Sequence, residues 1–352
     1  MYRSNFKAGG CEAIVNAAVW KGANQVDIDD IPIPEPRENE ALIRVKSVGV
    51  CMTDIHIIQG SFAYTSPPHV LGHEIAGVVA RDAGAYREGD RVVISTAVGC
   101  GKCYFCQNGM KFFCKEGGEI GYAPYQGGYA EYLCAPLDNL LRLPDNIGFD
   151  EGAVFESFVC PFGAVYNCGS LLGATTLIFG AGPAGLAFIL SAKAAGAGKI
   201  IVAARNPVRL AQAAAFGADA VVDVTREDVK NAVRKETGGL DPDVVIEAAG
   251  TQQSIADAIS LTRRGGKVLL YGIPGSDKAI PFPVNDIVTN QITVIGTMGN
   301  TGVWQLALDL LETGRISLAG LVTHRFPLER FKDALDLVAN KRDGVIKAVI
   351  HP

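Results

Sequence analysis

This 352-residue chain places four of its nine cysteines, Cys100, Cys103, Cys106 and Cys114, within one stretch of fifteen residues. An even distribution would put about 0.4 cysteines in such a stretch. The short spacings allow a looped backbone to direct four thiolates at one point, which is typical of a structural zinc site. An iron–sulfur cluster is the alternative, but the ferredoxin spacing has three residues before the last cysteine and a proline after it. Here seven residues intervene and Lys115 follows.

Three further residues of metal-binding type lie beside apolar runs: Cys51, His73 and Glu156. Taken singly, Cys51 could be a small buried hydrophobe and His73 a hydrogen-bonded core histidine. Glu156, however, is the only charge in a long apolar tract, where a carboxylate must be paired, protonated or bound to a metal. One Cys, one His and one Glu would leave a coordination position open, as in a catalytic zinc site.

A glycine-rich turn follows the apolar run 176–179 and precedes a segment of helix character. Its residues are Gly180, Ala181, Gly182, Pro183, Ala184 and Gly185. Between a strand and a helix, such glycines permit a tight turn, close approach of a pyrophosphate, and close helix packing. We expect a dinucleotide here, and a glycine-rich turn without a ligand is the alternative.

The residues at the end of the next strand bear on which dinucleotide binds. An NAD site has an acidic residue about 20 residues after the glycines, and Ala204 stands 24 residues after Gly180. Arg205 follows, and Arg209 lies one helical turn further. A missing carboxylate and a nearby guanidinium favour the 2′-phosphate of NADP. The alternative is that Arg205 stacks on adenine and that NAD is used.

Composition excludes several classes of protein. The net charge is −5 and 20% of residues are charged, so a basic nucleic-acid footprint is absent. Residues 157–192 carry no Asp, Glu, Lys or Arg, but glycines and prolines interrupt them, which predicts two buried elements and no membrane span. No secretory segment opens the chain, and a reducing cytoplasm is expected.

The elements that must position these residues change in character along the chain. Short strand-like runs dominate the first half, at 41–48, 75–80, 90–95 and 129–135. Six apolar strands connected mainly by helices then follow, at 176–179, 199–203, 220–223, 243–247, 267–271 and 292–296. This order predicts an α/β fold with a doubly wound parallel (Rossmann) sheet.

The remaining segments predict helices at 303–312 and 328–340 and strands at 321–326 and 345–350. We assign them to the first, mostly β domain, so that the Rossmann domain is an insertion. The predicted parts are a catalytic N-terminal part at 1–157 with a zinc lobe at 96–118, the dinucleotide-binding domain at 158–296, and a catalytic C-terminal part at 297–352.

Taken together, these motifs resemble the zinc-dependent medium-chain dehydrogenases/reductases, in the branch of the sorbitol (polyol) and threonine dehydrogenases. The resemblance runs from about Ala13 to Ile350, and it implies a GroES-like catalytic domain around the Rossmann sheet. The motifs that carry it are Gly-x-Cys-x-Thr-Asp-x-His at 49–56, Gly-His-Glu-x-x-Gly at 72–77, Gly-Asp-Arg-Val at 89–92, the four cysteines, the glycine turn and Leu-Val-Thr-His-Arg-Phe-Pro-Leu-Glu at 321–329.

The resemblance implies a role for each matching residue. Cys51 and His73 would bind the catalytic zinc, with Glu74 or Glu156 as inner-shell ligand, and the resemblance leaves open which of the two it is. Thr53 would take the substrate proton and His56 would pass it to solvent. Ile273 and Met298 complete the expected cofactor-binding set. One departure is Ser157, because proline usually follows the glutamate in polyol members.

We therefore expect two Zn²⁺ per chain and hydride transfer between NADP, or alternatively NAD, and a secondary alcohol or ketone. A polyol, sugar alcohol or amino alcohol is the expected substrate. The alternatives are a threonine-type or simple secondary alcohol dehydrogenase that uses NAD, and a catalytically silent NADP-binding protein. The resemblance also implies a homotetramer or dimer. Candidate pocket residues are Phe62, Tyr64, His69, Phe155 and Met298, with His69 more simply a surface histidine.

Overall fold

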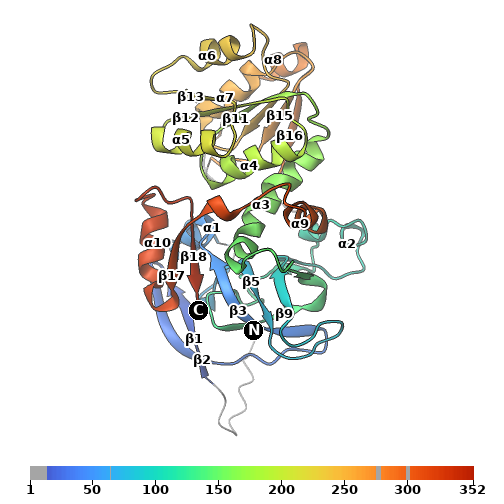
Figure 1. Ribbon diagram of the computed structural model, residues 1–352, viewed down its shortest axis with the longest axis vertical. Helices are drawn as coiled ribbons and strands as arrows, with labels where there is room; N and C mark the ends of the chain where they lie inside the picture. Colours follow the sequence, from blue (N-terminus) through green and yellow to red (C-terminus); the bar gives the residue numbers. More distant parts are fainter. Residues whose placement is uncertain (1–13, 64, 275–278, 299–301) are drawn as a thin grey trace.

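The computed structural model describes residues 14–63, 65–274, 279–298 and 302–352. Tyr64, one of the candidate pocket residues, lies outside these residues. Figure 1 shows a layered part built on β11 to β16 at one end and a part rich in irregular sheets at the other. The long helix α3 (Phe149–Cys168) runs between the two parts.

The layered part contains a parallel sheet in the order β13-β12-β11-β14-β15-β16. Its strands are β11 (Thr175–Phe179), β12 (Lys199–Ala204), β13 (Ala220–Asp223), β14 (Val244–Glu247), β15 (Lys267–Leu270) and β16 (Thr293–Gly296). This order reverses direction beside the first strand, where doubly wound folds bind their ligands. The predicted Rossmann sheet is confirmed, with all six strands near their expected positions.

Helices cover both faces of this sheet, so its strands are apolar on both sides. Successive residues of β11 illustrate this: Leu177 and Ile178 are both fully buried but belong to different core clusters. The covering helices are α4 (Pro183–Ala194), α5 (Pro207–Ala215), α6 (Val229–Glu236), α7 (Gln252–Leu261) and α8 (Val284–Thr289).

The other part is built mainly on antiparallel pairs. One sheet has the order β10-β6-β5-β3-β18-β17, with β9 also on β3, and a second has the order β2-β1-β4. The strands are β1 (Ile14–Gly22), β2 (Gln25–Pro32), β3 (Glu40–Gly49), β4 (His69–Val70), β5 (Glu74–Val79), β6 (Arg91–Ile94), β9 (Tyr132–Pro136), β10 (Leu140–Arg142), β17 (Val322–Pro327) and β18 (Lys347–His351). This mostly β part agrees with the predicted fold class.

After β16 the chain returns to this mostly β part. Helix α9 (Trp304–Glu312) packs against α3, and α10 (Phe331–Ala339) lies between β17 and β18 in sequence. Strand β18 pairs antiparallel with β3, with Val349 opposite Gly49. The last residues of the chain therefore lie beside the strand that leads into the Cys51 motif.

The uncharged tract at 157–192 forms three buried elements, where two were predicted: β11, most of α4, and residues 157–168 of helix α3. Helix α3 begins after Gly148, with Asp150 and Glu151 in its first turn, where acidic side chains favour a helix dipole. The predicted boundary between residues 157 and 158 falls inside this helix. Among the described residues, no helix combines the length and the apolar character needed to cross a membrane.

Candidate active site and metal centres

The four clustered cysteines lie in a small lobe. It is formed by β7 (Ala97–Val98), α2 (Tyr104–Gln107), the 3-10 helix η1 (Lys111–Phe113) and β8 (Gly118–Glu119). The four Sγ atoms lie within 4.8 Å of one another. Backbone N–H groups of Lys102 and Cys103 lower the pKa of the Cys100 thiol to about 7, whereas burial raises that of Cys106 to about 11. Four convergent thiols of this kind fit a tetrahedral zinc ion with no free position.

A second cluster brings together Cys51, His73 and Glu74, whose ligand atoms also lie within 4.8 Å of one another. Strand pairing explains this proximity, because β3 and β5 are antiparallel and place Gly49 opposite Glu74. Cys51 follows β3 by two residues and is the N-cap of α1 (Met52–Ile58), while His73 directly precedes β5. A thiol, an imidazole and a carboxylate fit zinc and leave a fourth position open.

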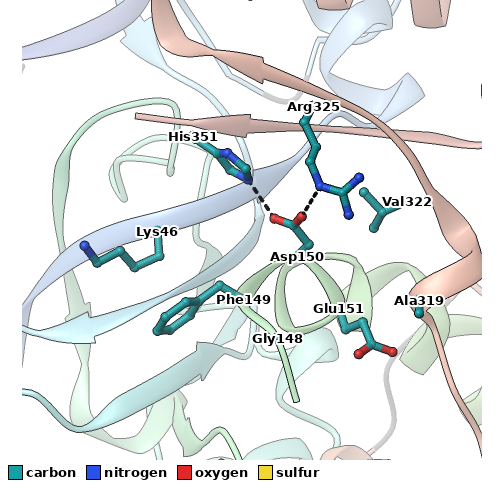
Figure 2. A pocket seen from close by; sticks show the side chains of 9 residues that line it. All are labelled: Lys46, Gly148, Phe149, Asp150, Glu151, Ala319, Val322, Arg325 and His351. Atoms are coloured by element: carbon teal, nitrogen blue, oxygen red, sulfur yellow. Dashed lines mark hydrogen bonds and ion pairs between the residues drawn. The ribbon is translucent and has the colours of Figure 1, made fainter. Parts of the chain in front are cut away.

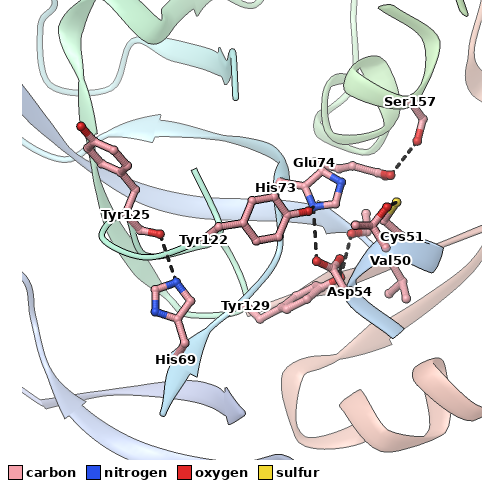
Figure 3. Close-up of polar contacts among 12 residues, drawn as sticks. Val50, Cys51, Asp54, His69, His73, Glu74, Tyr122, Tyr125, Tyr129 and Ser157 are labelled. Carbon is pink, nitrogen blue, oxygen red and sulfur yellow. Dashed lines mark hydrogen bonds and ion pairs between the residues drawn. The ribbon is translucent and has the colours of Figure 1, made fainter. Parts of the chain in front are cut away.

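Buried polar groups orient the imidazole of His73 (Figure 3). Its Nδ1 atom lies 3.3 Å from Oδ1 of Asp54 and 3.2 Å from the hydroxyl of Tyr122. Asp54 is fully buried, and its Oδ2 accepts a 2.7 Å hydrogen bond from Tyr129. Burial by itself would lower the pKa of His73, but Tyr122, Asp54 and Cys51 raise it well above its usual value. With Nδ1 engaged, Nε2 is the nitrogen left for a metal.

The Glu74 carboxylate has two unlike oxygens. Oε1 accepts hydrogen bonds from Ser157 Oγ at 2.6 Å and from Lys347 Nζ at 2.5 Å. Oε2 is buried and has no hydrogen-bond partner among the described residues. A side chain at Gly49 would collide with Oε2, so that glycine leaves room for the carboxylate. A buried carboxylate that keeps one oxygen without a partner, in a cluster with a thiol and an imidazole, fits a bound cation.

Glu156 lines a cavity beside the cluster, together with Cys51 and His73, but is not a member of the three-residue cluster. Its Oε1 accepts a hydrogen bond from Cys160 Sγ at 3.3 Å, one helical turn along α3. Burial raises the pKa of Glu156 above its usual value. Of the two candidate glutamates, Glu74 is therefore the one whose oxygen lies with Cys51 and His73.

A cavity of about 390 Å³ opens onto this cluster between the two parts of the molecule. Thr53, Phe62 and Met298 line it, as expected. Phe155 does not, because it is fully buried in the core of α3. The remaining lining residues include Cys51, His73, Phe112, Tyr122, Glu156, Ser157, Cys160, Pro183, Ala184, Tyr271, Ile273 and Lys347.

The interpretation of His69 as a surface histidine is wrong. His69 is only 5% exposed and lies on β4, which pairs with β1. Its Nε2 contacts the backbone oxygen of Tyr125 at 3.1 Å, and burial lowers the pKa of the imidazole. His69 is therefore a buried structural residue that does not line the cavity.

The two expected proton-transfer residues lie one turn apart on α1. Thr53 lines the cavity, and its Oγ1 lies 3.6 Å from the Sγ of Cys51. His56 is half-buried, does not line the cavity, and contacts Ser61 Oγ through Nδ1 at 3.4 Å. This arrangement places a hydroxyl at the cavity and an imidazole behind it toward solvent.

The glycine turn faces the same cavity from the parallel sheet. Gly180 has φ +103°, a conformation that favours glycine, and a Cβ at Gly185 would collide with the carbonyl oxygen of Gly180. Gly182 is the N-cap of α4, and nothing lies within 4 Å of a Cβ built there. Open space at a helix N-terminus fits a pyrophosphate, and Pro183 and Ala184 line the cavity itself.

The three residues expected to select NADP differ in environment. Ala204 is half-buried at the end of β12, and Arg205 is exposed. Arg209 lies on α5 and donates through Nη2 to the backbone oxygen of Val345 at 2.7 Å. Its Nη1 is buried and has no partner among the described residues. Arg209 therefore contacts the C-terminal segment at Val345 through Nη2, and its Nη1 could donate to a further acceptor.

Sequence reasoning missed Asp54, Tyr122, Ser157 and Lys347 as site residues. Asp54 belongs to the motif at 49–56, and Ser157 stands where proline is usual in polyol members, but neither residue type by itself indicates a contact with a metal ligand. Lys347 is 4% exposed and lies 273 residues from its partner Glu74. Its only sequence signal is a charge within the apolar closing strand.

A second cavity, of about 430 Å³, lies elsewhere in the mostly β part, at the beginning of α3 (Figure 2). Asp150 at its centre pairs with Arg325 at 2.6 Å and with His351 at 2.7 Å. Ser47 Oγ donates to the same carboxylate at 2.9 Å. These contacts join α3 to β3, β17 and β18.

Comparison with known proteins agrees with this geometry. Residues 37–145 match the family model of the alcohol dehydrogenase GroES-like domain, and residues 183–313 match that of the zinc-binding dehydrogenases. The chain is 34% identical to the sorbitol dehydrogenase of Bombyx mori (95% of this chain, 98% of the relative) and 30% identical to that of Bacillus subtilis (96% and 97%). A Sinorhizobium meliloti structure with NADP bound, described as a zinc-binding dehydrogenase, superposes with a TM-score of 0.91 at 29% identity over 97% of this chain and 100% of the other.

Proposed function

Since this chain belongs to the zinc-dependent medium-chain dehydrogenase/reductase family, in the branch of the sorbitol dehydrogenases, we propose that it oxidises a secondary alcohol of a polyol, sugar alcohol or amino alcohol with NADP. Zinc dependence and alcohol oxidoreductase activity follow from the family. The single observation that carries the proposal is the cluster of Cys51, His73 and Glu74, whose Cys51 and His73 line a cavity that is also lined by Pro183 and Ala184 of the dinucleotide turn.

We propose Cys51, His73 and Glu74 as the ligands of the catalytic zinc, with Glu156 near but outside the ligand set. When bound there, zinc supplies Lewis acidity toward the oxygen of the alcohol. Four thiolates, from Cys100, Cys103, Cys106 and Cys114, would hold the structural zinc.

The chain's own residues would move the proton and position the substrate. The Thr53 hydroxyl lies where it can accept the substrate proton, and His56, one turn along α1, would pass it to solvent. Phe62 and Phe112 provide apolar walls that exclude water. Bound NADP would supply the hydride acceptor, with its pyrophosphate at Gly182 and the start of α4, and its ring toward Ile273 and Met298.

Preference for NADP rests on Ala204 and Arg205. Without a carboxylate at 204, the site does not repel a 2′-phosphate, and the exposed guanidinium of Arg205 can bind one. Arg209, whose buried Nη1 has no partner in the described part of the chain, is a second candidate for the same phosphate. Replacing Arg205 with Ala should raise KM for NADP by about 10-fold or more. The matched control is Arg315→Ala, an exposed arginine after α9 that is not proposed to contact the phosphate, which should leave KM unchanged.

The test of the proposed function is a metal analysis combined with a substrate screen. We expect two zinc ions per chain, and turnover of polyols or other secondary alcohols with NADP preferred over NAD. One zinc or none, or activity that survives removal of both metals, would contradict zinc-dependent catalysis at this cluster. A strong preference for NAD would contradict only the assignment of Ala204 and Arg205.

The domain division and the assembly are also proposals. We keep the catalytic parts at 1–157 and 297–352 and the dinucleotide-binding part at 158–296. A homotetramer or dimer is supported by β16, which pairs with a strand on only one side among the described residues, and by exposed apolar side chains that precede it in the chain. These are Phe282, Val284 and Val288. Light scattering should show an oligomer, and Val288→Arg should weaken it.

We also propose a cytoplasmic location, because the described cysteines are free thiols and four of them converge at one point.

A further inference from the structure

We propose that Ser157 is a positioning residue for the catalytic metal: with Lys347, it holds the Glu74 carboxylate by one oxygen and thereby reserves the other oxygen for zinc. This inference rests on the proposed zinc site and goes beyond it, because Ser157 itself contacts no metal, cofactor or substrate in the proposal. Its effect would pass entirely through Glu74.

The first step of the argument is the unequal treatment of the two carboxylate oxygens. Oε1 accepts two hydrogen bonds, 2.6 Å from Ser157 Oγ and 2.5 Å from Lys347 Nζ, whereas Oε2 has no partner among the described residues. The carboxylate is fully buried, and its Cys51 and His73 neighbours belong to the metal-binding cluster. A buried oxygen without a partner is costly unless a cation binds it.

The second step is that the two donors come from different elements. Ser157 lies on α3, and Lys347 is the first residue of β18. The Lys347 ammonium also donates to the backbone oxygen of Val50 at 3.1 Å, so its position is fixed independently of Glu74. Two donors that converge on Oε1 from separate elements leave the carboxylate little freedom to turn.

The third step concerns what Lys347 would do alone. The terminal torsion of a glutamate is broad, so a carboxylate with one partner can rotate. Lys347 is 4% exposed, and a buried ammonium gains from contact with both oxygens of its counter-ion. Without Ser157, rotation toward Lys347 would bring Oε2 to the ammonium and leave neither carboxylate oxygen free for a metal. The serine hydroxyl therefore prevents the Lys347 ammonium from taking the carboxylate oxygen that the metal would bind.

The fourth step concerns the location of Ser157 and the need for a hydroxyl group there. Ser157 is half-buried and lines the cavity next to Glu156, so α3 presents both residues to the site. A hydroxyl is needed at this position, because alanine or proline has no side-chain donor. The departure from the polyol pattern at this position thus coincides with a contact to a proposed metal ligand.

The experiment measures zinc retention by the full chain during competition with a chelator. In Ser157→Ala, affinity at the cluster should fall by about 10- to 100-fold, while the zinc of the four cysteines in the same chain stays bound. Ser157→Thr keeps the hydroxyl and should restore affinity. The matched control is Ser47→Ala, which removes a serine-to-carboxylate bond of the same kind at Asp150 and should change neither zinc. With Co²⁺ in place of zinc, the visible spectrum should change in Ser157→Ala and not in Ser47→Ala.

Each outcome decides a separate point. Unchanged zinc affinity in Ser157→Ala would overturn the positioning role and leave the proposed function intact. A wild-type chain that binds only the structural zinc would overturn the proposed function itself. If Ser157→Ala loses both metals, the fold is affected and Ser157→Thr decides: equal loss there contradicts the proposal, and retention of both metals supports it.

Discussion

The Nδ1 atom of His73 lies 3.3 Å from the buried carboxylate of Asp54, which in turn accepts a hydrogen bond from Tyr129. Asp54, on α1, thus connects the residue before β5 to Tyr129, whose hydroxyl also donates to the backbone oxygen of Gly49 at 3.1 Å. The ring of His73 is therefore fixed by groups that never contact the substrate cavity directly, apart from Tyr122.

Replacing Asp54 with Asn should weaken zinc binding at the cluster by about 10- to 100-fold, because an amide orients and charges the imidazole less well than a carboxylate. Zinc competition measures this affinity, and thermal unfolding checks the fold. Asp82→Asn, an exposed aspartate of the same part of the chain, is the control. Full zinc affinity in Asp54→Asn would show that His73 needs no carboxylate partner.

Replacing Cys51 with Ser should reduce turnover by about 10³-fold or more, because the loss of Lewis-acid stabilisation is worth several kcal/mol. NADP binding should remain nearly unchanged, since the glycine turn lies on the other part of the molecule. Steady-state kinetics and fluorescence titration of the cofactor measure the two effects. Retained turnover would argue against catalysis at this cluster.

Replacing Cys103 with Ser should release the structural zinc and lower the melting temperature. The effect should reach the substrate as well, because Phe112 of the same lobe lines the cavity, so KM should rise. Metal content, calorimetry and kinetics report these changes. Cys134→Ser, a half-buried cysteine outside the lobe, should keep both zinc ions. An unchanged metal content in Cys103→Ser would contradict a four-cysteine site.

Asp150 predicts a specific loss of stability in acid. Burial opposes ionisation of this carboxyl, but His351, Ser47 and Arg325 together lower its pKa below the usual 3.8. A lowered pKa in the folded chain means that the stabilisation is complete above pH 3.8 and is lost as the pH falls below it. Asp150→Asn should reduce the free energy of unfolding by about 1 kcal/mol near neutral pH, a modest value because Arg325 and His351 are partly exposed.

Denaturant titrations of the wild type and Asp150→Asn at several pH values measure this difference. It should shrink as the pH is lowered through the range below 3.8. The exposed Asp145 provides the control, since its variant should show no comparable pH dependence. A difference that stays constant from neutral pH to pH 3 would exclude the ionised carboxylate as its source.

Local spacing made much of the site predictable. The four cysteines are so close in sequence that many loop conformations can bring their thiols together. The strand, glycine turn and helix around Gly180 likewise form one continuous unit. For these features, the physical cause lies within about fifteen residues of chain, which is why sequence patterns report them.

Contacts between distant segments were not predictable in the same way. His69 directly follows Pro67 and Pro68, as a residue of a surface loop often does, yet pairing of β4 with β1 buries it. The choice between Glu74 and Glu156 depended on the register of β3 and β5 and on the side of α3 that faces Cys160. Neither register nor helix rotation can be read from residue types alone.

The sequence by itself thus predicted two groups of metal-binding residue types, the glycine turn, and a parallel sheet that follows a mostly β part, because each depends on short-range spacing and hydrophobic periodicity. Only the tertiary structure decided which carboxylate lies with Cys51 and His73, and which groups hold it there. Lys347 reaches Glu74 across 273 residues and Ser157 reaches it across 83. Such contacts arise from packing of β18 and α3 against β5, and no local pattern encodes them.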